Sequence, residues 1–289
     1  MDFLSPNPWN HDFAPLPRST KENRKILSRS GDDPHPEVSL DHTDAWVFDL
    51  DGVLTDTASL HERVWTELFC GLFAHQAGQG ALPASRSFTG ADYHRLVDGE
   101  SRMDGIRNVL ADREITLPQG HPDDLAGNTS IWALANDKDA RYLALLATVG
   151  PRPFASSVDL LRRLRNAGVG VAIVSASRHC AHVLDVAGLN PLVDVRVDGE
   201  TAEVLRLPGK PDPAMFVEAA RRLGVDPSRA AVVEDALAGV EAGRRGTFAV
   251  VVGVDRTNQA NALREHGADV VVKDLGNIIL VGSGPRGTP

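Results

Sequence analysis

Acidic and hydroxyl residues of this chain follow short apolar runs, at the points where strands are predicted to end. Asp49 and Asp51 follow one run, Ser175 follows another, and Glu234 and Asp235 follow a third. Ligands of a parallel sheet bind beyond the carboxyl ends of its strands, so we expect these side chains to face one crevice. An acidic pair at a strand end is also common in turns and caps, so each pair alone is weak evidence. Their combination indicates a site.

The chemistry of such a crevice follows from its charge. Carboxylates that converge repel one another and raise each other's pKa unless a cation neutralises them. Mg²⁺ is the natural cation, because it takes hard oxygen ligands and often works through substrate phosphate. Asp49 and Asp51, two apart on an extended segment, point in similar directions, so one can attack phosphorus while the other handles a hydroxyl proton. Lys210 and Ser175 would bind the phosphoryl oxygens. The pattern predicts magnesium-dependent phosphoryl transfer.

Helical and strand patterns alternate from about Pro151 onwards and would position these residues. The predicted strands are Ala45–Phe48, Gly170–Val174, Asp194–Val197, Ala230–Val233, Phe248–Val252 and Asp269–Val272. The predicted helices between them are Ser157–Asn166, Arg178–Ala187, Pro213–Leu223 and Leu237–Arg244. Strands separated by helices imply parallel crossovers. We therefore expect an α/β fold with a three-layer, Rossmann-like parallel-sheet core.

A second, all-helical unit is predicted between the first strand and this alternation. The segment from Ala58 to about His75 reads as an amphipathic helix, in which we assign Trp65 to the core. Residues 82–148 have no strand signal; their helical stretches are Ser101–Arg113 and Leu125–Leu146. We expect an inserted helical cap domain. The predicted division is a disordered leader at 1–43, a core domain at 44–76 and 150–280, the cap at 77–149, and a flexible tail at 281–289.

Composition narrows the class of protein. The chain has 289 residues, of which 42% are hydrophobic, enough to bury a sizeable core. Its net charge of -9 argues against a general nucleic-acid binder. There is no apolar segment of membrane-spanning length and no signal-peptide pattern, so we expect a cytoplasmic protein without a membrane partner. Cys70 and Cys180 are expected to be free thiols, and the protein is expected to be a monomer.

Four strings carry a family resemblance. FDLDGVLTDT, from Phe48 to Thr57, resembles the first motif of the haloacid dehalogenase superfamily, in its β-phosphoglucomutase-like branch. VSASR at 174–178, GKPDP at 209–213 and VEDALAGV at 233–240 resemble the later motifs, in the same order. The similarity spans about Asp44 to Asp274. It implies an enzyme of carbohydrate metabolism that acts on a small phosphorylated sugar.

The resemblance also implies roles for individual residues. Asp49 would be the aspartyl-phosphate nucleophile and Asp51 the general acid and base. Mg²⁺ would be held by the Asp49 side chain, the Asp51 backbone carbonyl, Glu234 and Asp235. The residues expected to bind substrate or phosphate are Ser175, Ala176, Arg178, Lys210, Arg102, Thr57 and His61.

Several of these residues have a structural alternative. Arg102 resembles the cap arginine that holds the distal phosphate of a sugar bisphosphate, but it could also be a solvated arginine at a helix start. Thr57 and His61 could orient the Asp51 loop or simply suit the beginning of a helix. His179 and Cys180 are assigned no role. Arg178 stands where the mutase loop usually has lysine, and Asp98 stands near an expected cap lysine, which weakens the substrate assignment.

Two reactions remain open within this family. A β-phosphoglucomutase interconverts β-glucose 1-phosphate and glucose 6-phosphate, whereas a sugar-phosphate phosphatase lets water discharge the phosphoaspartate. Thr57, His61 and Arg102 favour the mutase. A non-catalytic binding module is disfavoured by the complete acidic and basic set. A P-loop protein is disfavoured because the chain has no G-x-x-x-x-G-K-[ST] segment.

Overall fold

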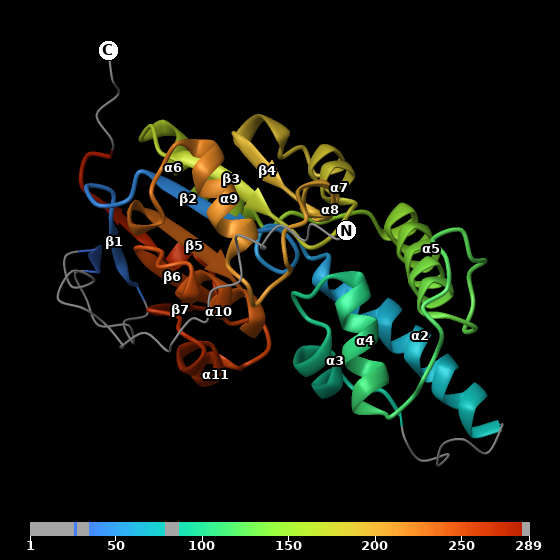
Figure 1. Ribbon diagram of the computed structural model, residues 1–289. Helices are drawn as coiled ribbons and strands as arrows, with labels where there is room; N and C mark the ends of the chain where they lie inside the picture. The colour runs from blue at the N-terminus through green and yellow to red at the C-terminus, as the bar shows by residue number, and fades with distance from the viewer. Residues whose placement is uncertain (1–25, 28–34, 79–86, 285–289) are drawn as a thin grey trace, which may run out of the picture.

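A six-stranded parallel sheet forms the main unit of the computed structural model, which describes residues 26–27, 35–78 and 87–284 (Figure 1). The strands lie in the order β4-β3-β2-β5-β6-β7. Their bounds are β2 Ala45–Asp49, β3 Gly170–Val174, β4 Val195–Val197, β5 Ala230–Glu234, β6 Val250–Val254 and β7 Val270–Val272. The predicted α/β parallel-sheet fold is confirmed.

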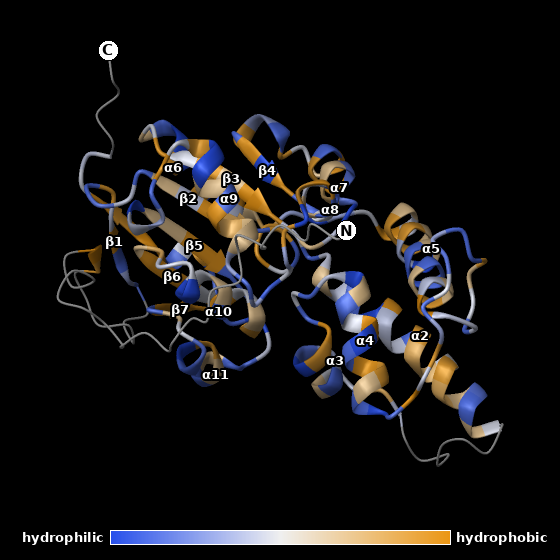
Figure 2. Ribbon diagram, viewed as in Figure 1, coloured by the Kyte–Doolittle hydropathy of each residue, from blue (hydrophilic) through white to orange (hydrophobic). Residues whose placement is uncertain are grey.

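Both faces of this sheet are buried, which explains why its strands are nearly continuous apolar runs. Along β2, the side chains of Trp46 and Phe48 enter one apolar cluster, and those of Ala45 and Val47 enter the cluster on the other face. This alternation is the two-residue period of a strand. Figure 2 shows mostly orange, hydrophobic residues along the central strands, and both orange and blue residues along the helices around them.

Helices cover each face of the sheet and complete the three layers. The first cluster contains residues of α6 Ala155–Asn166 and α7 Cys180–Val186, and the second contains residues of α9 Ala214–Leu223, α10 Leu237–Arg245 and α11 Ala260–Glu265. A further helix, α8 Gly199–Leu205, follows β4. Sequence analysis did not predict α8 or α11, because each is a short polar segment without an apolar stripe.

The second unit is helical and lies beside the carboxyl ends of the strands (Figure 1). It contains α2 Ala58–Gly78, α3 Gly90–Leu96, α4 Arg102–Asp112 and α5 Ile131–Val149. A third apolar cluster joins these helices through residues such as Phe69, Leu96, Ile106 and Leu134. We predicted α2 as part of the core domain, but from Trp65 onwards its buried residues pack with the cap. The helix predicted from Leu125 begins only at Ile131, where Ser130 caps it.

The last part of the predicted disordered leader is ordered in the structure. Residues Glu37–Ser39 form β1, which pairs in parallel with β8 Ile279–Val281, and Val38 is fully buried. This pairing also brings the first residue of the predicted tail into a strand. The remaining leader and tail positions, except 26–27, 35–43 and 281–284, lie outside the described residues. Strand β6 begins at Val250 rather than Phe248, since Phe248 packs against Phe216 before the strand.

The described ranges contain no helix long and apolar enough to cross a membrane. Cys70 and Cys180 are free thiols, as predicted.

Candidate active site

A buried lysine between two carboxylates lies at the centre of the site. Asp49 is the last residue of β2 and Glu234 the last of β5, which is the neighbouring strand. Lys210 Nζ donates to Glu234 Oε2 at 2.6 Å and also to Asp49 Oδ1. Burial alone would lower the pKa of Lys210, but Asp49 and Glu234 raise it above its ordinary value. The lysine therefore keeps its charge and holds the two carboxylates together.

Asp49, Glu234 and Asp235 form a group that fits a cation. Each offers a carboxylate oxygen, and these oxygens all lie within 4.8 Å of one another. Glu234 is committed to Lys210 and, through Oε1, to the backbone N–H groups of Asp235 and Ala236, each at 3.1 Å. The Asp235 carboxylate, in contrast, is 7% exposed and has no polar partner among residues 35–78 and 87–284. Burial, followed by the charges of Asp98 and Glu234, raises its pKa.

Two glycines make room for this group. A Cβ on Gly52 would lie 1.8 Å from Asp235 Oδ2, and one on Gly239 would lie 1.9 Å from Glu234 Oε2. Gly52 also has a φ of +85°, which L side chains rarely adopt. Glycine at position 52 therefore lets the loop after β2 approach Asp235, and glycine at position 239 of α10 leaves room for the Glu234 side chain. A hard divalent cation such as Mg²⁺ matches these oxygen donors.

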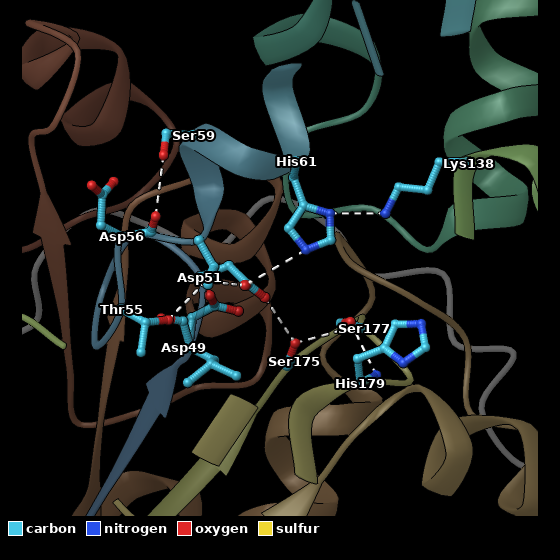
Figure 3. A network of polar contacts seen from close by, with 12 residues as sticks. Asp49, Asp51, Thr55, Asp56, Ser59, His61, Lys138, Ser175, Ser177 and His179 are labelled. Atoms are coloured by element: carbon cyan, nitrogen blue, oxygen red, sulfur yellow. Dashed lines mark hydrogen bonds and ion pairs between the residues drawn. The ribbon is translucent and has the colours of Figure 1, made fainter. Parts of the chain in front are cut away.

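Asp51 lies outside this carboxylate group and belongs to a second network (Figure 3). Thr57 Oγ1 donates to its Oδ1, Ser175 Oγ donates to its Oδ2 at 3.1 Å, and His61 Nε2 lies 3.6 Å from Oδ1. Burial raises the pKa of Asp51, while the hydrogen bonds from Thr57 and Ser175 oppose this rise. A raised pKa suits a carboxyl group that must give and take a proton.

His61 links Asp51 to a buried lysine of the cap, which sequence analysis missed. Lys138 Nζ lies 2.8 Å from His61 Nδ1 (Figure 3). The imidazole also stacks on Tyr142, with ring centroids 4.1 Å apart. Burial, and then the charge of Arg102, lowers the pKa of Lys138 to about 7. Burial and Lys138 also lower the pKa of His61 well below its usual value. A cap residue thus contacts the acid–base network of the core.

The signal for Lys138 was present in the sequence. Leu134, Lys138, Tyr142 and Leu146 recur at intervals of four residues and are all buried on α5. A single lysine in the apolar stripe of an amphipathic helix is unusual, because a buried ammonium needs partners. Lys138 lies within 5.2 Å of the Trp65 and Tyr142 ring centroids.

The other predicted residues lie around one pocket between cap and core. Arg102 is the first residue of α4, and its side chain is 16% exposed, so it is not a solvated helix-start arginine. Ala176 and Arg178 line the same pocket. The Arg178 side chain is exposed, and its Nη2 lies 3.6 Å from Glu203 Oε2. His179, to which we assigned no role, also lines it. Trp65 is both a core residue, as predicted, and part of the pocket wall.

Comparisons with known proteins agree with this geometry. Residues 43–247 match the family model of haloacid dehalogenase-like hydrolases. The chain is 46% identical over 241 residues to a β-phosphoglucomutase of Mycobacterium bovis, covering 81% of this chain and 91% of that protein. It is 30% identical over 236 residues to a validoxylamine A 7'-phosphate phosphatase of Streptomyces hygroscopicus subsp. limoneus, covering 79% and 92%. A crystal structure of β-phosphoglucomutase from Clostridium difficile superposes with a TM-score of 0.63 at 24% identity, covering 81% and 92%.

The chain belongs to the haloacid dehalogenase-like hydrolase family. Within it, the chain falls in the β-phosphoglucomutase-like group of enzymes, as the motifs predicted.

Proposed function

We propose that this enzyme transfers the phosphoryl group of a sugar phosphate through a phosphoaspartate at Asp49, and that its main reaction interconverts β-glucose 1-phosphate and glucose 6-phosphate. The observation that carries the proposal is that two neighbouring aspartates, Asp49 and Asp51, have different partners. Asp49 contacts Lys210 beside Glu234 and Asp235, whereas Asp51 is held by hydroxyl groups and has a raised pKa. The 46% identity to a β-phosphoglucomutase supports the choice of substrate.

Each residue of this pair performs one part of the transfer. A carboxylate oxygen of Asp49 forms a bond to phosphorus while the bond from phosphorus to the sugar oxygen breaks. Asp51 gives its proton to that leaving oxygen and later takes a proton from the incoming hydroxyl. In this proposal, Lys210 and Ser175 bind the phosphoryl oxygens. Asp49, Glu234 and Asp235 would hold Mg²⁺, which when bound neutralises charge on the phosphoryl group.

A mutase must favour a sugar hydroxyl over water as the acceptor. Arg102 lines the same pocket as Asp49 and Asp51. In this proposal it binds a second phosphate of the sugar. Binding at both ends orients the acceptor hydroxyl, and a well-oriented acceptor can gain about 7 kcal/mol over a free one. Lys138 of the cap contacts His61 of the acid–base network. Closure of the cap over a bound substrate would exclude water from this network.

A phosphatase of the same fold is the second candidate. One observation favours it. Asp98 of the cap lines the pocket, and its charge raises the pKa of Asp235, so a carboxylate of the cap faces the reaction centre. The similarity to the validoxylamine A 7'-phosphate phosphatase agrees with this alternative.

One product assay distinguishes the two reactions. The enzyme is incubated with β-glucose 1-phosphate, Mg²⁺ and a trace of glucose 1,6-bisphosphate, and both glucose 6-phosphate and inorganic phosphate are measured. The mutase proposal predicts that glucose 6-phosphate forms faster than inorganic phosphate and that the bisphosphate is required. Inorganic phosphate as the main product, without a bisphosphate requirement, would establish the phosphatase instead.

A further inference from the structure

The cationic end of the pocket contains one carboxylate that the proposed reaction does not use. This end is lined by Arg102, Arg178 and His179, and the carboxylate is Asp139 of α5. Asp139 Oδ1 lies 2.5 Å from Arg102 Nη1 and 2.9 Å from His179 Nε2. A single oxygen atom therefore contacts two of the three groups that could bind an anionic end of the substrate.

These contacts are well shielded from water. The side chains of Arg102, His179 and Asp139 are 16%, 20% and 32% exposed. Arg102 Nη1 also donates to the Ala135 carbonyl oxygen at 3.2 Å, which fixes the guanidinium against α5. Although burial opposes it, the hydrogen bond from His179 and the charge of Arg102 lower the pKa of Asp139. Asp139 is thus a charged, partly buried partner of both groups.

The Asp139 contacts also connect the two units. Arg102 and Asp139 belong to α4 and α5 of the cap, whereas His179 precedes α7 of the core. Figure 3 shows His179 on the core loop, across from Lys138 of α5. The contact from Asp139 to His179 therefore ties the cap to the core at this pocket.

We propose that Asp139 is a built-in competing anion, which occupies Arg102 and His179 until the distal phosphate of a sugar phosphate displaces it. The inference deepens the proposed function, since it rests on a distal phosphate at Arg102. A phosphate dianion carries twice the charge of Asp139 and can win this exchange, but a neutral sugar end cannot. Asp139 therefore makes the site more selective for substrates that carry a phosphate dianion at this end, and it lowers the affinity of the enzyme for them.

The test measures binding rather than turnover. Glucose 6-phosphate is titrated calorimetrically into wild-type enzyme and the Asp139→Asn variant in chelator, where the proposed chemistry does not run. Asparagine keeps the size of the side chain but removes its charge. We expect the dissociation constant of Asp139→Asn to be about three- to fivefold lower than that of wild type, the upper part of the range for a partly exposed ion pair. Asp139→Ala should give the same direction.

Two further variants make the result specific. Asp137→Asn removes the same charge from the same helix, but Asp137 pairs with Arg141 and does not line the pocket. Its dissociation constant should stay within about twofold of wild type, because a surface pair contributes little. In an Arg102→Ala background, Asp139→Asn should give a clearly smaller gain, since Asp139 then competes only for His179.

Several results would overturn the inference. These are weaker or unchanged binding in both Asp139 variants, a gain of the same size with and without Arg102, or no glucose 6-phosphate binding by any of the proteins. The product assay decides separately between mutase and phosphatase. A failure of that assay leaves the Asp139 comparison intact, and a failure of the Asp139 comparison leaves the catalytic assignment intact.

Discussion

Replacing Lys210 with methionine tests the electrostatic balance of the site. Lys210 is 2% exposed, and its Nζ contacts Asp49 and lies 2.6 Å from Glu234 Oε2. Methionine keeps an unbranched side chain of similar length but carries no charge. The variant would therefore leave Asp49, Glu234 and Asp235 buried within 4.8 Å of one another, without the ammonium that offsets them.

The cost can be estimated from this geometry. Removing one partner of a buried ion pair typically destabilises a protein by about 3–5 kcal/mol, because the remaining charge stays buried. At about 2–4 °C per kcal/mol for a domain of this size, the melting temperature of Lys210→Met should fall by roughly 6–20 °C in chelator. Turnover should fall by about 10²–10³-fold or more, the range for loss of a preorganised donor to a developing negative charge.

Calorimetric melting with chelator and with Mg²⁺ provides the readout. Mg²⁺ should raise the melting temperature of Lys210→Met more than that of wild type, because a bound cation would offset part of the uncompensated charge. Lys273→Met is the matched control: Lys273 is exposed and donates to Asn258, so its melting temperature should change by less than about 2 °C. If Lys210→Met melts within about 2 °C of wild type in chelator, this reasoning is wrong.

Three further changes test other parts of the site and fold. Asp235→Ala should sharply raise the Mg²⁺ concentration needed for half-maximal turnover, and an unchanged requirement would remove Asp235 from the metal site. Asp51→Asn should slow sugar-phosphate turnover by about 10²–10⁴-fold but slow 4-nitrophenyl phosphate turnover less, because nitrophenolate leaves without a proton; equal losses would argue against the acid role. Hydrogen bonds from Arg221 and Arg222 lower the pKa of Glu218 from 4.5 to about 2. The charged Glu218 therefore stabilises the fold above about pH 4.5, and this stabilisation is lost as the pH falls towards 2. Glu218→Gln should therefore lower the free energy of unfolding by about 1–2 kcal/mol at pH 7, after allowance for the exposed Arg221, and by progressively less below pH 4.5. Urea denaturation of both proteins measures this difference in unfolding free energy, and a difference that stays the same at low pH would contradict the stabilising role of Glu218.

The core of the fold was predictable because its signals are local. Each central strand is a short apolar run that ends at a polar residue, and Asp49, Ser175 and Glu234 occupy those ends. Parallel pairing then brings them together without further information. Strand β1 was missed for the opposite reason. Its three residues form a strand only by pairing with β8, which lies about 240 positions later in the chain.

The cap side of the site was harder to predict because it depends on tertiary packing. Asp139 and His179 are 40 positions apart, and nothing in either local sequence indicates that they meet. Arg102 was found through a motif, but its partner Asp139 was not. Lys138 was detectable as a charge on an apolar helix face, although its contact with His61 required the docked cap.

Direct detection of a phosphoryl group on Asp49 is the measurement closest to the central claim. Wild-type enzyme is mixed with Mg²⁺ and glucose 1,6-bisphosphate, quenched in acid and digested, and the peptide that carries Asp49 is examined by mass spectrometry. We predict that this peptide gains the mass of one phosphoryl group in wild type, gains it much more slowly in Asp51→Asn, which lacks the acid for the leaving sugar oxygen, and does not gain it in Asp49→Asn. Turnover of sugar phosphate by Asp49→Asn at a tenth of the wild-type rate or more, or a phosphoryl group located on another residue, would contradict the account.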